Sequence, residues 1–288
     1  MRAASPKGVG MEGLPAIRDA DYRFVADLLY ERFGIQFGDK KKILVAGRLA
    51  KRLRELGLSD FSEYVKMLQS DRSGAELVEL VNRLTTNHSY FFRESEHFDY
   101  LRETVFPSLG QSTPRPQGRG FRIWSAGCAA GEEAHSIAIT MREGFGAALS
   151  GADQAILATD ISLKALQIAG AGIYPESRLR DMPKDYLARY FSKCEDGQYK
   201  AHPSIHDLIL FKRLNLMTIP YPFKGQFDVI FCRNVMIYFD KEAKASLVGA
   251  LYEFVKPGGY LFTGQSETIQ RGESPFVYVK PGIYRRIG

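Results

Sequence analysis

The sequence predicts an α/β protein in which an all-helical N-terminal domain precedes a domain built on a doubly wound parallel sheet. Three observations support this fold class. Up to about residue 106, apolar residues recur at helical spacing. Residues 107–120 are rich in Pro, Gly and Ser, which is the composition of a linker. From residue 121 onwards, short apolar runs alternate with amphipathic stretches, which indicates strands alternating with helices.

The N-terminal part is expected to contain a disordered tail at residues 1–15, rich in Gly, Ala and Pro, and a helical domain at residues 16–106. Gly57 is a candidate C-cap and Asp60 a candidate N-cap. Helices are expected over residues 17–33, 40–56, 61–68, 75–84 and 95–104.

The C-terminal part, residues 121–288, is expected to hold the sheet. The run at 227–232 is apolar throughout, as in a strand buried on both faces. The other strands are expected over residues 121–125, 155–159, 208–214 and 260–263, with a closing hairpin over 276–279 and 283–286, and helices over 132–145, 163–169 and 241–255.

The composition is that of an ordinary globular protein, with 45% hydrophobic and 25% charged residues. A net charge of +6 fits an acidic partner, which leaves nucleic acid, an anionic membrane and an acidic protein surface open. The three cysteines include no Cys-x-x-Cys pair, so we expect reduced thiols. The N-terminus lacks a signal-peptide core, and no apolar run approaches about 18 residues, so a cytoplasmic location is expected.

Two motifs at the ends of neighbouring strands indicate a ligand site. The Gly-rich segment Trp124–Glu133 follows a strand and opens a helix, where free N–H groups meet a ligand; alternatively, it is only a fold signature. It is neither a G-x-G-x-x-G pattern nor a phosphate-binding loop, which disfavours NAD and ATP. Asp160 ends the next strand, where an acidic residue binds ribose hydroxyls; the alternative is helix capping.

Two further motifs carry polar residues in unusual settings. Arg233 and Asn234 follow the buried strand at its carboxyl end, and the alternative for Arg233 is a surface ion pair. The segment Leu84–Ser95 interleaves polar groups with phenylalanines, and its alternative is a connection between helices.

Together these motifs resemble the CheR family of chemotaxis receptor methyltransferases, over about residues 17–286. The segments that carry the resemblance are Thr85–Glu94, Trp124–Ala138, Phe231–Asp240 and Gly264–Glu267. The departures from the family pattern are Ser89 for a usual Thr, Ala134 for a usual Pro and Gln265 for a usual His.

The resemblance implies a Rossmann-like class I methyltransferase domain with a small antiparallel β-subdomain insert, at about residues 190–212. It also implies that S-adenosylmethionine binds between the two domains and leaves as S-adenosylhomocysteine. Tyr238 is then expected close to the transferring methyl group. The implied cofactor contacts are Asn87, Ser89, Arg93, Glu133, Asp160, Asn215, Leu216, Arg233 and Asn234.

The reaction implied by the family, methylation of glutamate, needs little acid–base chemistry. The side chain of a solvent-exposed glutamate has a pKa of about 4.3, so the acceptor is already ionised at neutral pH. Catalysis then consists mainly of alignment. Arg93 is expected to orient the carboxylate through charge-assisted hydrogen bonds, and Tyr238 to donate a hydrogen bond or shape the methyl channel. No metal is expected, because His202 and His206 flank Pro203 and lack a third ligand.

The helix expected over residues 40–56 is the candidate docking surface for the substrate. One face is apolar and the other basic, and the alternative is a merely solvated basic face. Glutamate-rich methylation helices of chemoreceptors would fit such a surface. The residues proposed to bind them are Arg48, Lys51, Arg52 and Arg54.

Two competing functions are a nucleic-acid methyltransferase, disfavoured because no Asn-Pro-Pro-Tyr-type motif is present, and a non-catalytic cofactor-binding scaffold. We expect no nucleic-acid partner, and contact with the membrane only through receptors. We also expect no tether to a receptor's C-terminal pentapeptide. Peptide-binding members of the family carry a longer Gly-x-Gly loop where the short turn in Phe191–Tyr199 has only Gly197.

Overall fold

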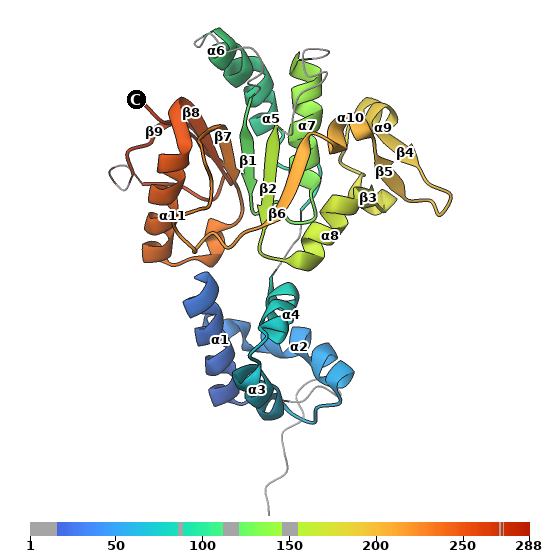
Figure 1. Cartoon of the computed structure of the whole chain (residues 1–288), viewed down its shortest axis with the longest axis vertical. Helices are drawn as coiled ribbons and strands as arrows, with labels where there is room; N and C mark the ends of the chain where they lie inside the picture. The colour runs from blue at the N-terminus through green and yellow to red at the C-terminus, as the bar shows by residue number, and fades with distance from the viewer. Residues whose placement is uncertain (1–15, 86–88, 112–120, 146–154, 271, 273) are drawn as a thin grey trace, which may run out of the picture. The chain divides into compact units, whose positions relative to one another are not determined.

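The computed structural model describes residues 16–85, 89–111, 121–145, 155–270, 272 and 274–288 (Figure 1). The predicted tail at residues 1–15 and most of the predicted linker lie outside these ranges. The chain divides into two compact units, residues 1–86 and 87–288. None of the helices within the described ranges is long and apolar enough to span a membrane.

The first unit contains four α-helices in its described part: α1 (Asp19–Phe33), α2 (Lys42–Leu56), α3 (Phe61–Ser70) and α4 (Ala75–Leu84). A 3₁₀ turn, η1 (Asp39–Lys41), precedes α2. The predicted caps are confirmed. The Asp60 carboxylate accepts from Ser62 N at 2.9 Å and from Glu63 N at 3.1 Å, while Gly57 ends α2 in the left-handed region.

The second unit is built on a seven-stranded sheet in the order β6-β2-β1-β7-β8-β10-β9. Its first five strands are parallel, and the last two are added antiparallel. The strands are β1 (Ile123–Ala126), β2 (Ile156–Asp160), β6 (Ile209–Arg213), β7 (Phe227–Cys232), β8 (Val255–Thr263), β9 (Val277–Lys280) and β10 (Ile283–Arg285). The predicted fold class is therefore confirmed.

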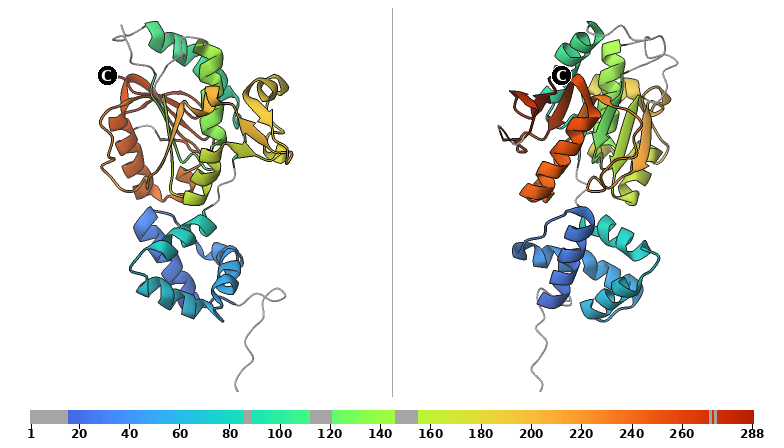
Figure 2. Two further views of the ribbon diagram at one scale, coloured as in Figure 1. Left: turned by 45° about the vertical axis from the view of Figure 1, so that its right-hand side comes forward. Right: turned by 60° about the vertical axis from the view of Figure 1, so that its left-hand side comes forward.

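Helices cover both faces of this sheet (Figure 2). From β1 the chain passes through α7 (Glu132–Phe145) to β2, and then through α8 (Leu163–Ala171) toward the β6 edge. From β7 it passes through α11 (Lys241–Phe254) to β8, in the opposite direction along the sheet. Because parallel crossovers are right-handed, α7 and α11 lie on opposite faces.

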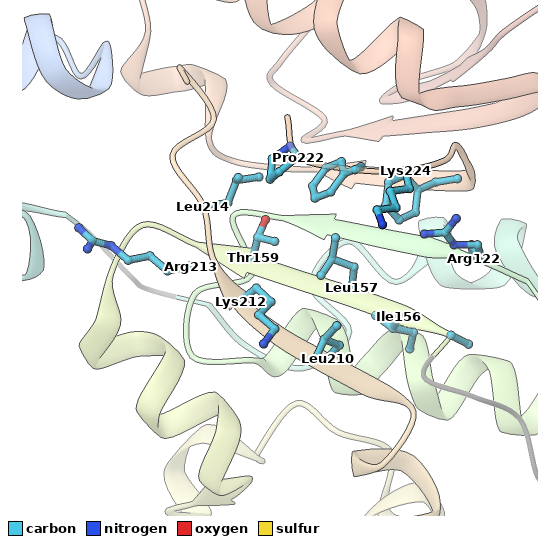
Figure 3. Close-up of a pocket in the computed structure, with 13 residues that line it drawn as sticks. Arg122, Ile156, Leu157, Thr159, Leu210, Lys212, Arg213, Leu214, Pro222 and Lys224 are labelled. Carbon is cyan, nitrogen blue, oxygen red and sulfur yellow. The ribbon is translucent and has the colours of Figure 1, made fainter. Parts of the chain in front are cut away.

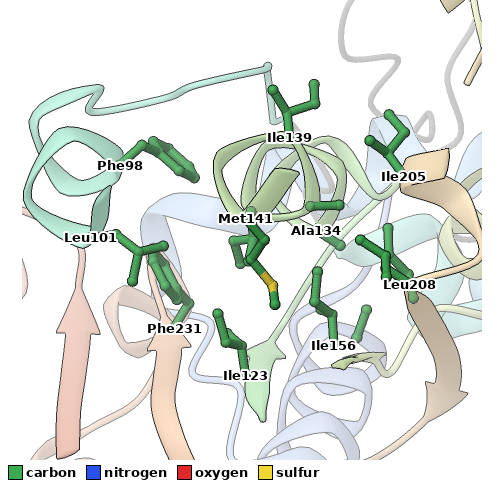
Figure 4. Close-up of a cluster of buried hydrophobic side chains, with 14 of the residues drawn as sticks. Phe98, Leu101, Ile123, Ala134, Ile139, Met141, Ile156, Ile205, Leu208 and Phe231 are labelled. Carbon is green, nitrogen blue, oxygen red and sulfur yellow. The ribbon is translucent and has the colours of Figure 1, made fainter. Parts of the chain in front are cut away.

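The domain boundary falls between residues 86 and 87, not at residue 106 as the sequence pattern suggested. The helical stretch of α5 (Glu96–Tyr100), η2 (Leu101–Val105) and α6 (Phe106–Gln111) belongs to the second unit. Figure 4 shows Phe98 and Leu101 beside Phe231 of β7, and the rings of Phe98 and Phe231 stack at 6.0 Å. A helical pattern shows which face is apolar but not which core that face covers.

The predicted β-subdomain is present, but its position differs from residues 190–212. A three-stranded antiparallel sheet has the order β3-β5-β4, formed by β3 (Ile173–Tyr174), β5 (Tyr199–Ala201) and β4 (Phe191–Lys193). It lies between α8 and β6, together with η4 (Glu176–Arg178), α9 (Lys184–Tyr190) and α10 (Pro203–His206). Residues 209–213 instead pair with β2 in the main sheet. The two-residue strand β3 is too short to produce an alternating pattern.

Candidate functional site

The candidate site lies at the carboxyl ends of the parallel strands. The connection from β1 leads toward the β6 edge, whereas that from β7 leads toward β8, so the chain reverses its direction between these adjacent strands. In open α/β sheets, ligands bind outside such a reversal point. The segments after β1, β2, β7 and β8 all leave the sheet at this edge.

The Gly-rich loop after β1 is held by the end of β2. Asp160 Oδ2 accepts from Ala129 N at 2.9 Å, and Oδ1 accepts from Ser162 N at 2.8 Å. Burial raises the pKa of Asp160, and the hydrogen bonds from the backbone oppose this rise. Ser162, not Asp160, is the N-cap of α8, since its hydroxyl accepts from Ala165 N. The carboxylate predicted to bind ribose therefore also fixes the loop.

Glycine is required at Gly127, because the approach to the β7 loop is close. Its φ of 86° lies in the left-handed region, and a Cβ there would be 2.4 Å from Val235 Cγ2. Ala129 in the same loop also has a positive φ, 49°. Strained backbone of this kind persists where the surroundings enforce it, and it is common at functional sites.

Arg233 is buried between two carboxylates. It donates from Nη1 to Glu133 Oε2 at 3.2 Å and from Nη2 to Glu94 Oε2 at 3.1 Å. Nη2 also donates to the backbone carbonyl of Arg93, and the guanidinium lies 5.5 Å from the centre of the Phe98 ring. With its side chain 1% exposed, Arg233 does not form the surface ion pair that was the alternative interpretation.

Glu133 accepts a second hydrogen bond, from Ser125 Oγ at 2.7 Å. Burial raises the pKa of the Glu133 carboxyl, and the charge of Arg233 lowers it. Three segments distant in sequence, at residues 93–94, 125–133 and 233, are thus joined around one cation. Both terminal nitrogens of Arg233 donate hydrogen bonds within the protein, so this side chain orients Glu133 and Glu94.

The segment before α5 is attached to the second unit and, over residues 89–95, is not helical. Phe91 packs edge-on against Tyr174 at 5.1 Å, and Phe92 N donates to Ser136 Oγ at 3.0 Å. Phe92 and Glu94 have positive φ angles of 56° and 55°. Asn87 lies outside the described residues, and Ser89 is partly buried.

The Arg93 side chain lies over the ring of Tyr90, at 5.7 Å. Asn215 and Leu216 follow β6, beside the end of β2, since Leu214 N donates to Asp160 O. Asn215 Oδ1 accepts from Met217 N at 3.0 Å within its own turn. Tyr238 ends the 3₁₀ turn η5 (Met236–Tyr238) and is partly buried.

Two acidic residues of the quoted motifs connect these loops, although the sequence had given them no role. The first is Glu94, whose carboxylate also accepts from Gln265 N at 3.2 Å. The second is Glu267, whose carboxylate accepts from the backbone of Asn234 and Ile237. The Gly-Gln-Ser-Glu sequence at the end of a strand was the available signal.

The histidine pair considered for zinc has a different environment. His206 Nδ1 is 3.1 Å from His135 Nε2, and His135 Nδ1 is 2.9 Å from the Gly131 carbonyl. His202 is exposed. Burial lowers the pKa of His135 to about 3, so this ring is neutral and connects the β-subdomain to the Gly-rich loop.

A hollow of about 420 Å³ lies on one face of the sheet, beside β2 and β6 (Figure 3). Its floor includes Leu157 and Leu210, and basic residues such as Lys212 and Lys224 surround it. Neither Glu133 nor Arg233 lines it, so this hollow is separate from the candidate site. It lies where residues 214–226 pass from β6 to β7 without a helix.

Residues 87–283 match the family model described as CheR methyltransferase, SAM binding domain, and residues 20–85 match CheR methyltransferase, all-alpha domain. The chain is 39% identical over 259 residues to the chemotaxis protein methyltransferase of Borreliella burgdorferi, which covers 90% of this chain and 91% of that protein. It is 38% identical over 255 residues to that of Salmonella typhimurium, covering 88% and 85%. With that of Escherichia coli the identity is 36% over 272 residues, covering 93% and 91%.

Proposed function

Because this chain belongs to the CheR methyltransferase family, we propose that it transfers the methyl group of S-adenosylmethionine to glutamate side chains of chemoreceptors, giving glutamyl methyl esters. The observation that carries this proposal is the buried Arg233, held between Glu94 and Glu133 at the sheet edge where the family's cofactor motifs converge. Receptor partners also favour a cytoplasmic location, with contact to the membrane only through the receptors.

The residues at this edge suit S-adenosylmethionine, which supplies a methyl group activated by its positively charged sulfur. Gly127 allows close approach of the backbone, and Asp160 is a buried carboxylate at the end of β2 that is suited to ribose hydroxyls. Asn215, Leu216 and Asn234 lie on the neighbouring loops, and Glu133, in the first turn of α7, is held in place by Arg233. Asn87, Ser89 and Arg93 complete the proposed set.

The chain's own contribution to the reaction is to align the acceptor carboxylate with the methyl group. An ionised glutamate needs no general base. We assign Arg93 to orient the incoming carboxylate and Tyr238 to shape the channel or donate a hydrogen bond to the acceptor. A guanidinium presents paired N–H donors to a carboxylate, so it fixes direction as well as position.

The substrate-docking surface that we propose differs from the one drawn from the sequence. Arg48 donates to the Leu84 carbonyl at 2.6 Å, and Arg52 is paired with Glu76 of α4. Both side chains therefore face α4. Lys51 and Arg54 are exposed, and they form the basic part of the proposed surface for glutamate-rich methylation helices.

The function is tested by transfer of label from methyl-labelled S-adenosylmethionine to receptor, RNA and DNA. We expect label on receptor alone, in a form released by mild base, because methyl esters hydrolyse where N-methyl groups do not. Label on nucleic acid would support the competing methyltransferase, and cofactor binding without transfer would support the scaffold.

The docking surface is tested by the double variant Lys51→Glu/Arg54→Glu, with Lys66→Glu, an exposed charge on α3, as the matched control. We expect a higher receptor KM for the double variant only, with unchanged affinity for S-adenosylhomocysteine. The difference should shrink as salt screens the charges. A wild-type KM for the double variant at low salt would place docking elsewhere.

We further propose that recognition does not depend on a receptor tether. The turn between β4 and β5 is tight: Cys194 N donates to Gln198 O at 2.7 Å, and Gly197 N donates to Cys194 O at 3.0 Å. Such a turn offers little backbone to open around a peptide. Calorimetric titration with a receptor C-terminal pentapeptide should show no binding, and micromolar affinity, about −8 kcal/mol, would contradict the proposal.

A further inference from the structure

Two loops leave the sheet side by side at the site. Strands β7 and β8 are parallel neighbours, with Cys232 opposite Thr263. The turn after β8 is closed by its own backbone, since Glu267 N donates to Gly264 O at 2.8 Å. The Thr263 hydroxyl donates to the Glu267 carbonyl at 2.9 Å. This turn holds the Glu267 side chain against the loop after β7.

The Glu267 carboxylate accepts from three backbone N–H groups. Oε2 accepts from Asn234 N at 2.6 Å and from Gly264 N at 2.8 Å, and Oε1 accepts from Ile237 N at 3.1 Å. The residue is 7% exposed. All three partners are N–H donors, so an ionised carboxylate can accept from each of them. A side-chain amide in its place would point its own NH₂ group at one of these N–H donors.

The loop after β7 is held in an uncommon backbone conformation. Asn234 has a φ of 58°, in the left-handed region, which Asn adopts more readily than most other residues with a side chain. The space around it is full: a Cβ on Gly264 would lie 2.7 Å from Asn234 Nδ2 and 2.8 Å from Glu267 Oε2. Glu267 and Gly264 together therefore fix the conformation in which Asn234 and the turn to Tyr238 are presented.

We propose that Glu267 is a positioning residue for methyl transfer, acting through Asn234 and Tyr238. This inference rests on the proposed function, in which Asn234 meets the cofactor and Tyr238 the transferring methyl group. In this proposal the Gly-Gln-Ser-Glu turn fixes the conformation of the loop after β7, and the turn itself contacts neither substrate.

The decisive variant is Glu267→Gln, which keeps the shape of the side chain and replaces one acceptor by a donor. Its matched control is Glu253→Gln, an exposed glutamate near the end of α11. For Glu267→Gln we expect faster amide exchange at Asn234 and Ile237 and at least tenfold weaker binding of S-adenosylhomocysteine. We also expect kcat to fall at least tenfold, while receptor KM stays within about twofold. Glu267→Asp, which keeps the charge, should recover part of kcat.

Glu267→Gln with wild-type kcat, cofactor affinity and amide protection would overturn the proposal. So would a loss of thermal stability with kcat and affinity unchanged at a temperature where the variant is folded, because that result indicates a structural role only. If Glu267→Gln fails to fold, Gly264→Ala and Glu267→Asp test the same loop: unchanged affinity and kcat in both would also overturn it. If the wild type transfers no methyl group to receptors, the proposed function fails, yet the affinity and exchange measurements still decide the role of Glu267.

Discussion

Replacing Arg52 by alanine should destabilise the first unit, because this side chain is part of its packing. Arg52 Nε and Nη2 donate to the two oxygens of Glu76, at 3.0 and 2.6 Å, and Tyr64 Oη donates to the same carboxylate at 2.8 Å. Glu76 is 8% exposed. The Glu76 hydrogen bond raises the pKa of Arg52 above its ordinary value, and burial raises the pKa of Tyr64.

The magnitude follows from the carboxylate that is left behind. Removing one partner of a buried ion pair costs about 3–5 kcal/mol. The Arg52 side chain is 22% exposed, so water recovers part of this cost, and we expect a loss of about 2–3 kcal/mol. A domain of this size has a free energy of unfolding of about 4–10 kcal/mol. At about 4–8 °C per kcal/mol, the melting temperature of the first unit should fall by about 8–24 °C.

Differential scanning calorimetry of the full chain measures this change, with Lys51→Ala and Arg54→Ala as controls. Both control side chains are exposed on the same helix, and their variants should melt within about 2 °C of wild type. An Arg52→Ala variant that melts like these controls would refute the assignment of Arg52 to the packing between α2 and α4.

Three further predictions concern the second unit. Asp160→Ala should weaken binding of S-adenosylhomocysteine by roughly 1–3 kcal/mol, because Ala129 N and Ser162 N lose their acceptor along with the proposed ribose contact; unchanged affinity by calorimetry would contradict this. Arg93→Ala should lower turnover more than tenfold with little change in melting temperature, and near wild-type activity in a radiometric assay would exclude the orienting role. Burial lowers the pKa of His135 to about 3 in the folded chain, whereas in the unfolded chain it is about 6.5. Between these two pH values only the unfolded chain binds a proton at His135. The free energy of unfolding should therefore fall by up to ~1.4 kcal/mol per pH unit as the pH drops from about 6.5 toward 3. Urea midpoints should therefore depend less on pH in His135→Asn, and an identical dependence would show that another group is responsible.

The sequence predicted best where local pattern and tertiary environment agree. Residues 227–232 form β7 with the predicted bounds, because a strand buried on both faces is apolar at every position. Residues 75–84 form α4 with the predicted bounds, because apolar residues recur at helical spacing along its whole length.

Prediction failed where a partner distant in sequence decides the outcome. The helical wheel placed Arg48 and Arg52 on the docking face, but Glu76 and the end of α4 hold these side chains. Ile43 lies on the apolar face of the same wheel, yet it is 74% exposed in the first turn of α2. A helical wheel treats every turn of the helix as equally covered by neighbouring elements. Only the packed domain shows which turns are covered.

The candidate site was found by motif, but its internal connections were not. Sequence placed Arg233 at a strand end with an ordinary ion pair as the alternative, and the structure gives it two carboxylates. Glu94 is 139 positions away along the chain, and a single sequence contains no signal for such a pairing.

Trp124 makes the second unit optically distinct. It is the single tryptophan of the chain, fully buried in β1, with its indole N–H donating to Thr159 Oγ1 at 2.9 Å and the Phe223 ring 4.9 Å away. Its tryptophan fluorescence will therefore report the melting of the sheet, because the first unit contains no tryptophan. Circular dichroism follows the helices of both units, so the two signals recorded during one thermal scan separate the unfolding of the helical domain from that of the catalytic domain without labelling or truncation.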